Sequence, residues 1–452
     1  VVRTTLGTVK PATEVIFAPK AQADIEMARG IPGIVLVDDQ VPDDEGRKLL
    51  ERWGVREFET EDVARVILPN FRSEEWQNWS PVEYSRCLEF LRRWLRASEW
   101  QAPPKVKQRL GAVHVRVQTG EMRRADECYF RTDAMARLCP DGPFAVCGDA
   151  EEQQFLEALG VTGRPRIVQE VQGYYRREGP DRVPKWRDYF RWFRREAPVP
   201  RKAVVEIGGV PALALPFFEG PDEEAAVEVL EQLLQHWDSY YARYTDTRYR
   251  WRHDQSNSKW RSNQTLPNRS YFAWQLLETA WLPTDRGLTK PSAEVFVPYP
   301  KVRDVAGYLA AYVRVPDGWD ADALVQQEKR LFEFLGLRDE LDIEAALYLL
   351  EVAQAYPVND RLRDHLARLY RHMGLLAEMG QKQPELGDVA LLTVGGEFKL
   401  ADELIWNDDP AIGKHFAESL DFVWTPDSVE RYYLESFFRV AREIGRASCR
   451  ER

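Results

Sequence analysis

Four short stretches of this chain repeat one pattern, and this repeat constrains the fold more than any other feature. In each stretch a Gly is followed three residues later by Lys or Arg and, after four more residues, by Glu. The four sets are Gly7, Lys10 and Glu14; Gly120, Arg123 and Glu127; Gly287, Lys290 and Glu294; and Gly396, Lys399 and Glu403. Because Gly adopts a positive φ without the usual steric cost, each set predicts the turn of a β-hairpin. The Val-Ile-Phe type run after the turn is expected to be the second strand.

The segments after the hairpins repeat as well. Each of the first three leads to a helical stretch and then to a Gly between apolar residues, at Gly54, Gly160 and Gly336. The fourth copy is expected to end before its Gly. The simplest interpretation of the repeated Lys and Glu is that they are solvated turn and strand residues, paired at most with each other across the hairpin. A shared ligand contact and a contact between successive modules are the alternatives.

The spacing of the four copies predicts an insertion. The second and third copies lie about 165 residues apart and the other neighbours about 110 apart, which predicts extra structure over residues 161–280. That span holds 19 basic and 16 acidic residues, whereas the whole chain has a formal charge of -11. It also holds 19 of the 53 aromatic residues, so we expect it to be a domain of its own.

The predicted fold class is α+β, with repeated modules of a β-hairpin plus helix and an inserted α+β domain. The predicted domains are module 1 (1–107, hairpin 3–17), module 2 (108–160, hairpin 115–130), the insertion (161–280), module 3 (281–388, hairpin 281–297) and a truncated module 4 (389–442, hairpin 391–406).

Three elements of the insertion can be predicted from its pattern. Residues 185–195 place Trp186, Phe190 and Phe193 on one face of an amphipathic helix. Residues 202–218 predict a hairpin that turns at Gly208 and Gly209. Residues 222–244 predict a long helix with acidic residues in its first turn.

Residues 243–268 give the candidate contact site. Between residues 243 and 261 six basic and two acidic residues alternate with tyrosines and tryptophans, a mixture that can stack bases and follow phosphates. The same residue types form protein-binding hot spots. A structured loop whose aromatics pack back onto the domain, with its arginines on acidic neighbours, is the third and favoured possibility. The candidate contact residues are Arg243, Arg248, Arg250, Trp251, Arg252, Lys259, Trp260 and Arg261.

The third copy carries the fullest version of the repeat. Residues 281–297 read WLPTDRGLTKPSAEVFV, and FLGL follows at residues 334–337. This combination resembles the repeats of the sacsin family and of the related plant NO VEIN proteins with their bacterial counterparts. The other three copies extend the resemblance loosely over most of the chain. It implies a large parent protein in which a nucleotide-binding domain of the heat-shock-chaperone, gyrase and histidine-kinase type precedes such repeats.

The sequence contains no motif of that ATPase and no other catalytic motif. Residues 38–46 have acids without the glycine spacing of an adenine-binding motif, and no phosphate-binding loop occurs. His365 and His372 are two helical turns apart, too far for one metal without other ligands. Cys87 lies in an apolar helical context that predicts a buried thiol. We therefore expect no cofactor in this fragment, with any ATP and Mg²⁺ bound in a region upstream.

Composition and the two ends of the sequence indicate the cellular compartment and the extent of the natural protein. No apolar stretch approaches the roughly 20 residues that cross a bilayer, and the five Cys form no CxxC pair, which favours a cytoplasmic protein. The start without Met predicts the interior of a longer protein. Residues 443–452 match a translated sequencing adapter, so we expect them not to belong to the natural protein.

Two functions follow from these patterns. The first is a non-catalytic scaffold that couples an ATPase elsewhere in a chaperone-like parent protein to a protein partner or client. The alternative is a nucleic-acid-engaging component of a bacterial system, such as a defence system. An enzyme that uses scattered acidic residues is a third possibility, and it requires a cleft with converging carboxylates of raised pKa.

Overall fold

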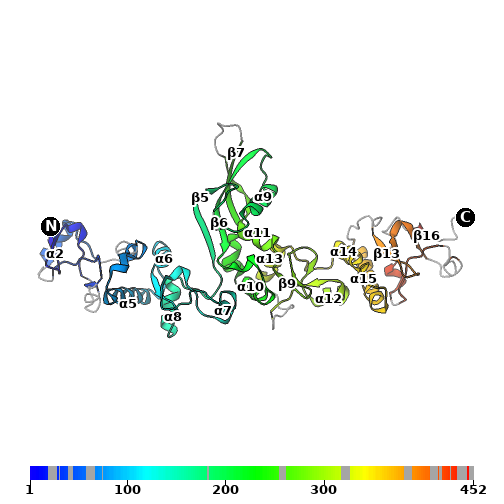
Figure 1. Cartoon of the computed structure of the whole chain (residues 1–452), viewed down its shortest axis with the longest axis horizontal. Coiled ribbons are helices and arrows are strands. Elements are labelled where there is room, and N and C mark those ends of the chain that lie inside the picture. The colour runs from blue at the N-terminus through cyan, green and yellow to red at the C-terminus, as the bar shows by residue number, and fades with distance from the viewer. Residues whose placement is uncertain are drawn as a thin grey trace. The chain divides into compact units, whose positions relative to one another are not determined.

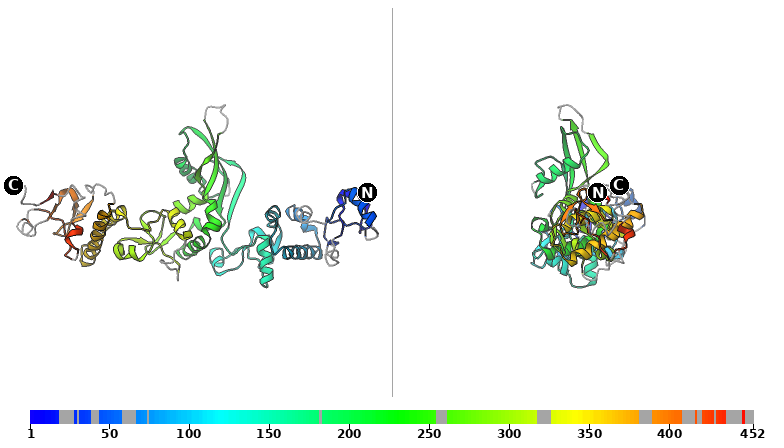
Figure 2. Two further views of the ribbon diagram at one scale, coloured as in Figure 1. Left: turned by 180° about the vertical axis from the view of Figure 1, so that it is seen from behind. Right: turned by 90° about the vertical axis from the view of Figure 1, so that its right-hand side faces the viewer.

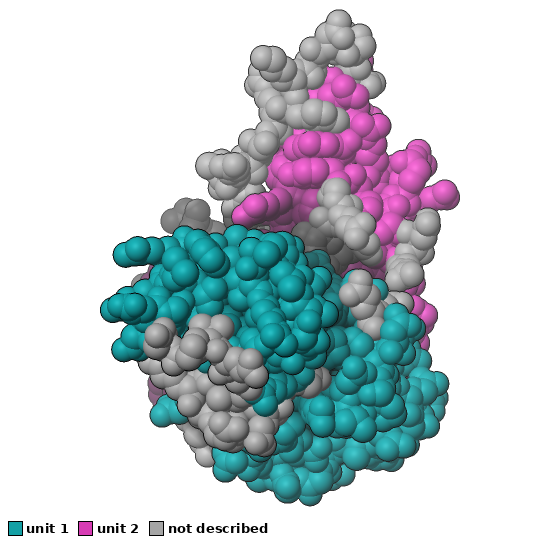
Figure 3. Space-filling view, turned by 90° about the vertical axis from the view of Figure 1, so that its left-hand side faces the viewer, with its two compact units in different colours: residues 1–166 teal, residues 167–452 magenta. Residues whose placement is uncertain are grey.

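The computed structural model shows an α+β protein that divides into two units, residues 1–166 and 167–452 (Figures 1 and 3). The structure describes residues 1–18, 28–29, 31–38, 44–57, 67–73, 75–180, 183–253, 261–316, 326–380, 389–407, 416, 420–427, 429–434 and 445–446.

All four predicted hairpins are present. Their strands are β1 (Val2–Arg3) with β2 (Val9–Lys10), β3 (His114–Arg116) with β4 (Met122–Arg124), β9 (Leu282–Thr284) with β10 (Gly287–Thr289), and β13 (Ala390–Leu392) with β14 (Phe398–Leu400). Each pair is antiparallel, and the repeated Gly has a positive φ of +71°, +89°, +97° and +86° in chain order. The prediction of four glycine-dependent hairpin turns is confirmed.

A buried residue three positions before each Gly closes the turn. In three copies it is a Thr, and the Thr284 hydroxyl donates to the carbonyl of Gly287 at 2.6 Å. In the fourth copy the amide of Glu397 donates to the Thr393 hydroxyl at 3.1 Å. The second copy places Val117 there instead, and its backbone alone forms the turn, since the amide of Gly120 donates to its carbonyl. The Thr hydroxyl therefore forms hydrogen bonds with backbone groups of its own turn.

The Val-Ile-Phe type run is not the second strand of the hairpin, and this part of the prediction is wrong. The second strand begins within three residues of the Gly and ends before that run. In three copies a one-turn 3₁₀ helix, Ala12–Glu14, Ala125–Glu127 or Ala401–Glu403, then redirects the chain. The run becomes a separate strand, which is longest in β11 (Val295–Phe296) and β15 (Ile405–Trp406) and is called the central strand below. A 3₁₀ turn at this point is too short to be visible as a period in the sequence.

The central strand pairs on both sides, with the same partners in every copy. One neighbour is a segment that also bridges the first hairpin strand. The parallel pairs on that side are Ile16–Leu36, Tyr129–Phe144, Phe296–Tyr312 and Ile405–Phe422, and the antiparallel bridges to the hairpin are Thr4–Val37, Val117–Ala145, Thr284–Val313 and Thr393–Val423. The second neighbour closes the module through the parallel pairs Ile16–Arg56, Tyr129–Thr162, Phe296–Arg338 and Ile405–Gly445. Each module is thus one five-segment mixed sheet with a single strand order.

The closing segment follows the predicted helix and Gly. Gly54, Gly160 and Gly336 have φ values of +100°, +114° and +70°, as expected of the left-handed residue that ends a helix. In the fourth copy β16 (Gly445–Arg446) takes the closing position. These two residues lie within the stretch 443–452, and the interpretation of that stretch as an adapter stays a prediction.

In unit 1, helices join two modules around one core. The core cluster includes Ile16 and Leu36 of the first module, Val115 and Cys128 of the second, and Leu91 between them. The helices are α2 (Asp44–Arg52), α4 (Leu68–Arg72), α5 (Pro81–Ala97), α6 (Pro104–Leu110), α7 (Asp133–Leu138) and α8 (Ala150–Leu159). Helix α5 begins at a capping box in which Ser80 and Glu83 bond each other's backbone amides.

In unit 2 the third and fourth modules share a core in the same way. Phe296 and Tyr312 of one and Leu391 and Trp406 of the other belong to a single cluster with α14 and α15. The helices are α12 (Pro300–Ala306), α13 (Gln326–Leu335), α14 (Ile343–Ala353) and α15 (Asp360–Glu378), and β12 (Ala311–Tyr312) pairs with β11. Shared cores between neighbours are the mark of a repeat protein.

The insertion forms a four-stranded antiparallel sheet in the order β5-β6-β7-β8. The strands are β5 (Ile167–Tyr175), β6 (Ala203–Leu213), β7 (Asp246–His253) and β8 (Arg261–Arg269), and the helices are α9 (Trp186–Glu196), α10 (Glu223–His236) and α11 (Tyr271–Glu278). Helix α9 lies against one face of the sheet (Figures 1 and 2). Trp186, Phe190 and Phe193 are buried there, which confirms the predicted amphipathic helix.

The hairpin predicted at Gly208 and Gly209 is wrong, because β6 runs through both glycines as one strand. Gly209 has a φ of +77°, and the Tyr174 ring lies where a Cβ on Gly208 would be, at 2.8 Å. The Thr247 hydroxyl donates to both glycine carbonyls, at 2.8 and 2.6 Å. The glycines therefore create an irregularity that lets an aromatic ring approach the strand, rather than a reversal.

The long helix predicted over residues 222–244 is present as α10 and two further turns. Asp222 caps its first turn, a π-helical turn spans Trp237–Tyr241, and a 3₁₀ turn spans Ala242–Tyr244. No helix in the described ranges is both long and apolar enough to cross a membrane. The boundaries predicted between the five domains stay predictions.

The fourth hairpin offers a matched test of the turn. Gly395 and Gly396 are adjacent, but only Gly396 has a positive φ, and a Cβ on either residue would meet no atom closer than 3.6 Å. We expect Gly396→Ala to lower the free energy of unfolding by about 1 kcal/mol. Gly395→Ala should change it by less than about 0.5 kcal/mol, since Leu6, Thr119 and Arg286 stand at this turn position in the other copies. Urea unfolding of the two variants measures the difference, and equal stability would contradict the role of the turn.

Candidate functional site

The candidate contact residues lie mainly on a β-ribbon rather than in a loop. Strands β7 and β8 are antiparallel neighbours, so the loop expected over residues 243–268 is wrong where these strands run. The other part of that expectation agrees with the structure, because Tyr249 and Trp251 pack back onto the domain and Arg250 bonds an acidic neighbour. Tyr249 and Trp251 alternate with arginines at the period of a half-buried strand, although the high charge suggests a loop. Lys259 and Trp260 lie outside the described residues, and Arg261 is described only as the first residue of β8.

A buried carboxylate holds the arginines of this sheet. Glu206 of β6 is 4% exposed, and its two oxygens accept from different arginines. The Nε of Arg250 donates to Oε2 at 2.7 Å, and the Nε of Arg176 donates to Oε1 at 2.6 Å. Because a carboxylate buried without donors is costly, this bridge fixes both guanidinium groups. Arg250 is therefore part of the fold's own hydrogen bonding.

An aromatic ring completes the bridge. The Arg250 guanidinium lies 4.0 Å from the centre of the Tyr174 ring, within the range of a cation–π contact. The Tyr174 ring lies over Gly208, in the space that a Cβ there would take. Gly208, Tyr174, Arg250 and Glu206 thus form one stack on the sheet face opposite α9.

The alternation of β7 divides its side chains between two faces. Tyr249 is buried and packs edge to face against Phe193 of α9, with ring centres 5.4 Å apart. Trp251 packs against the same core. Arg248 and Arg252 lie two residues from Arg250 on either side and share its face, because side chains alternate along a strand. The face opposite α9 is therefore basic, with Glu206 as its buried acid.

Arg243 lies apart from this group. It follows the π-helical turn, where its guanidinium lies 5.1 Å from the Tyr240 ring centre and 4.7 Å from that of Tyr244. It also donates to the Tyr244 hydroxyl at 2.9 Å. The structure brings Arg248, Arg250 and Arg252 together on one strand and holds Arg243 in a separate aromatic clamp.

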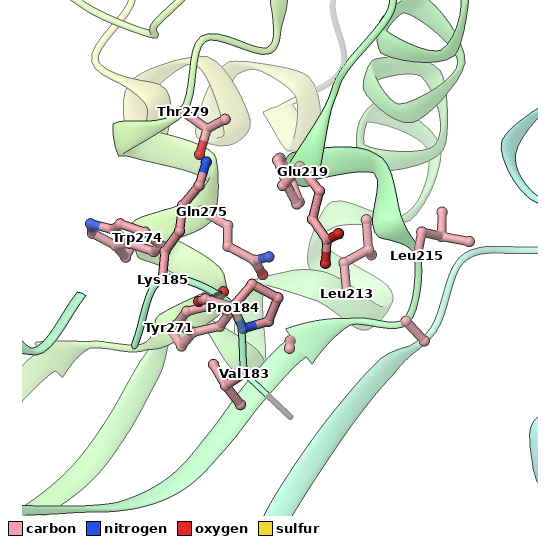
Figure 4. A pocket seen from close by; sticks show the side chains of 13 residues that line it. Val183, Pro184, Lys185, Leu213, Leu215, Glu219, Tyr271, Trp274, Gln275 and Thr279 are labelled. Carbon is pink, nitrogen blue, oxygen red and sulfur yellow. Dashed lines mark hydrogen bonds between the residues drawn. The ribbon is translucent and has the colours of Figure 1, made fainter. Parts of the chain in front are cut away.

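Sequence reasoning missed a cavity of about 280 Å³ beside this sheet (Figure 4). Its lining comes from the segment before α9, the end of β6, the turn after it and helix α11. These segments are far apart in the sequence, so no spacing of neighbouring residues could predict the cavity. The one signal that could have pointed to it is polar Gln275 in the otherwise apolar run YFAWQLL.

The titratable groups weighed from the sequence have structural surroundings. Burial raises the pKa of Cys87 to about 12, which confirms the predicted buried thiol. His365 packs on Tyr308, and burial together with Arg368 and Arg361 lowers its pKa. The ring of His372 bonds to the carbonyl of Leu341 at 2.6 Å. Within the described part of the chain, no three His, Cys, Asp or Glu side chains form a group that could hold a metal.

Fold and site together define an α+β repeat protein that carries an inserted sheet domain with a basic face and a small cavity. Comparison of the chain with protein-family models, with curated proteins and with solved structures finds no match.

The Glu206 bridge has a measurable consequence. Glu206→Gln keeps the side-chain shape but removes the charge that both arginines bond, so we expect the free energy of unfolding to fall by about 2 kcal/mol. Glu196→Gln is the matched control, because its partner Arg195 and its own side chain are largely exposed. That control should change stability by less than about 0.5 kcal/mol. Urea unfolding compares the two variants. Equal losses of the free energy of unfolding would show that the buried bridge stabilises the fold no more than an exposed ion pair does.

Proposed function

We propose that this chain is a non-catalytic scaffold that binds protein partners or unfolded clients, as part of a chaperone-like protein that resembles the sacsin and NO VEIN group. The observation that carries the proposal is the single sheet topology repeated in all four modules. Repeats that share cores with their neighbours present an extended series of equivalent surface positions, which repeat proteins use for binding.

The hairpin turns supply such positions. The Gly, the basic residue and the Glu that define the repeat recur in all four copies, whereas the residue before the Gly differs. It is Leu6, Thr119, Arg286 or Gly395. Leu6 is 67% exposed and Val394, in the fourth turn, is 59% exposed. Large apolar side chains held in solvent at the tip of a rigid turn suit contact with apolar segments of another polypeptide.

The arginines of the insertion favour this proposal over the nucleic-acid alternative. Arg250 and Arg176 already bond the buried Glu206, so their charge is partly neutralised before any partner arrives. Tyr249 and Trp251 pack toward α9, away from the basic face, and so do not offer their rings to bases.

Binding of an unfolded polypeptide tests the proposal. The full chain is titrated into fluorescently labelled, reduced and carboxymethylated α-lactalbumin, with native α-lactalbumin as the folded control. We expect saturable binding to the unfolded form alone. Leu6→Ser combined with Val394→Ser should weaken it about thirtyfold, since roughly 1 kcal/mol is lost for each of the two apolar contacts.

Thr119→Ser, at the turn position that corresponds to Leu6, is the control for that pair and should leave binding unchanged. If the unfolded probe does not bind the parent chain, or binds the double variant equally well, the proposed contact through the turns is wrong.

The basic face opposite α9 keeps nucleic acid as a second candidate, because Arg248, Arg250 and Arg252 line it together with Tyr174. Fluorescence anisotropy of a labelled single-stranded oligonucleotide, measured over a series of salt concentrations, separates the two. A nucleic-acid function requires binding that weakens as salt rises. In the double variant Arg248→Ala/Arg252→Ala, the slope of log binding constant against log salt concentration should become shallower by about 1.4, at about 0.7 for each lost phosphate contact.

Arg191→Ala, on the exposed side of α9, is the control for that test. The scaffold proposal expects no oligonucleotide binding at physiological salt. Binding that depends on Arg248 and Arg252 but not on Arg191 would transfer the proposal to nucleic acid.

A further inference from the structure

The cavity beside the insertion's sheet is built largely from apolar side chains. Trp274, Tyr271, Phe218 and Leu213 are each less than a tenth exposed and form its walls. Its volume of about 280 Å³ is just below the roughly 300–1,000 Å³ of sites for drug-sized ligands. The size therefore suits a molecule as small as a single amino acid.

One buried polar atom in this cavity lacks a partner. The Gln275 side chain is 7% exposed, and its Oε1 has no hydrogen-bond donor among the described residues. A buried amide oxygen left without a donor costs about 1–3 kcal/mol, so such atoms are rare in folded proteins. The neighbouring Tyr271 hydroxyl cannot fill the need, because it donates to the carbonyl of Pro184 at 2.6 Å. A ligand donor would satisfy Oε1.

Two opposite charges stand on either side of that amide. Figure 4 shows the Glu219 carboxylate and the Gln275 amide directed into the same space, with the Lys185 ammonium group reaching toward Thr279 on the other side. Lys185 and Glu219 are both exposed at the edge of the cavity, and neither forms an ion pair within the described part of the chain. Burial and the nearby Glu219 carboxylate raise the pKa of Tyr271, which agrees with a carboxylate that faces the cavity.

We propose that this cavity binds a small zwitterion, an α-amino acid with an apolar side chain. Its ammonium group donates to Glu219 and to Oε1 of Gln275, its carboxylate accepts from Lys185, and its side chain packs against Trp274 and Phe218. This occupant complements each of the three polar groups at once, whereas a simple cation would face Lys185 and a simple anion would face Glu219. The inference is independent of the proposed scaffold function.

Matched ligands test each charge separately. Isothermal titration of the full chain compares leucine with 3-methylbutylamine, which lacks the carboxylate, with 4-methylpentanoate, which lacks the ammonium group, and with leucinamide, which represents a peptide end. We expect leucine to bind at least about tenfold more tightly than each of the other three, because every one of them loses a charge-assisted hydrogen bond. Equal binding of leucinamide would assign the cavity to the N-terminus of a peptide and overturn the proposal of a free amino acid.

Variants assign the charges to residues. Glu219→Gln should weaken leucine and 3-methylbutylamine about tenfold and leave 4-methylpentanoate unchanged or stronger. Lys185→Met should do the reverse, weakening leucine and 4-methylpentanoate only. Glu178→Gln, an exposed acid outside the cavity, is the control for lost negative charge and should bind leucine as the parent does.

Gln275→Leu separates binding from folding. It removes an unpartnered buried oxygen, so thermal unfolding should occur at no lower temperature than in the parent, while leucine binding falls about tenfold. A stable Gln275→Leu variant that binds leucine as well as the parent does would overturn the proposal, and so would a parent chain that binds none of the four ligands. Neither outcome would bear on the binding of unfolded protein through the turns.

Discussion

The central strand of each module is the element on which the rest of the repeat depends. It is only one or two residues long in its regular part, yet it accepts parallel partners on both sides, as Phe296 does with Tyr312 and Arg338. A strand this short has few backbone hydrogen bonds of its own, so the module holds together only when both neighbours are present. One neighbour comes before the helix that leads to the closing segment, and the other neighbour is the closing segment itself. The central strand therefore ties the hairpin, the helix and the closing segment into one unit.

Helices connect the strands within a module and also join one module to the next. Parallel neighbours need a long connection, and in the third module these connections contain α12 and α13. Helices α14 and α15 follow the closing segment and bury their apolar sides against two successive modules, since Phe296 and Leu391 belong to one cluster with them. A single module cannot supply such a core alone, which is the physical reason for repetition in proteins of this kind.

The repeat could be found in the sequence because its turns depend on backbone geometry. Gly120 and Gly396 must have a positive φ, and only Gly takes it freely, so their spacing survives where the residues around them differ. The partner of the central strand that also bridges the hairpin was missed, because segments such as residues 33–37 and 422–424 are short apolar runs without a period. Short apolar runs predict burial but not the strand to which they pair.

In the insertion, tertiary contacts decide more of the structure than the local sequence pattern does. Its helix α9 was predictable from Trp186, Phe190 and Phe193, because a helix face is a local property. Gly208 and Gly209 misled for the same local reason: a pair of glycines favours a hairpin until a ring such as that of Tyr174 needs the space. Glu206 gave no signal at all, since one acid in a strand indicates neither of its two arginines.

The basic face and the cavity lie on different parts of the inserted domain and use different physical devices. On the face, charge is balanced internally, because Glu206 is buried and bonds two guanidinium groups. In the cavity, charge is separated, because Lys185 and Glu219 form no ion pair with each other and the buried amide oxygen between them has no donor among the described residues. Lys185 and Glu219 are exposed, so their lack of a partner costs little, whereas the buried amide oxygen of Gln275 is costly while no donor reaches it. A ligand that donates to this oxygen would offset that cost, which is why the cavity, and not the arginine-rich face, is the stronger indication of a specific ligand.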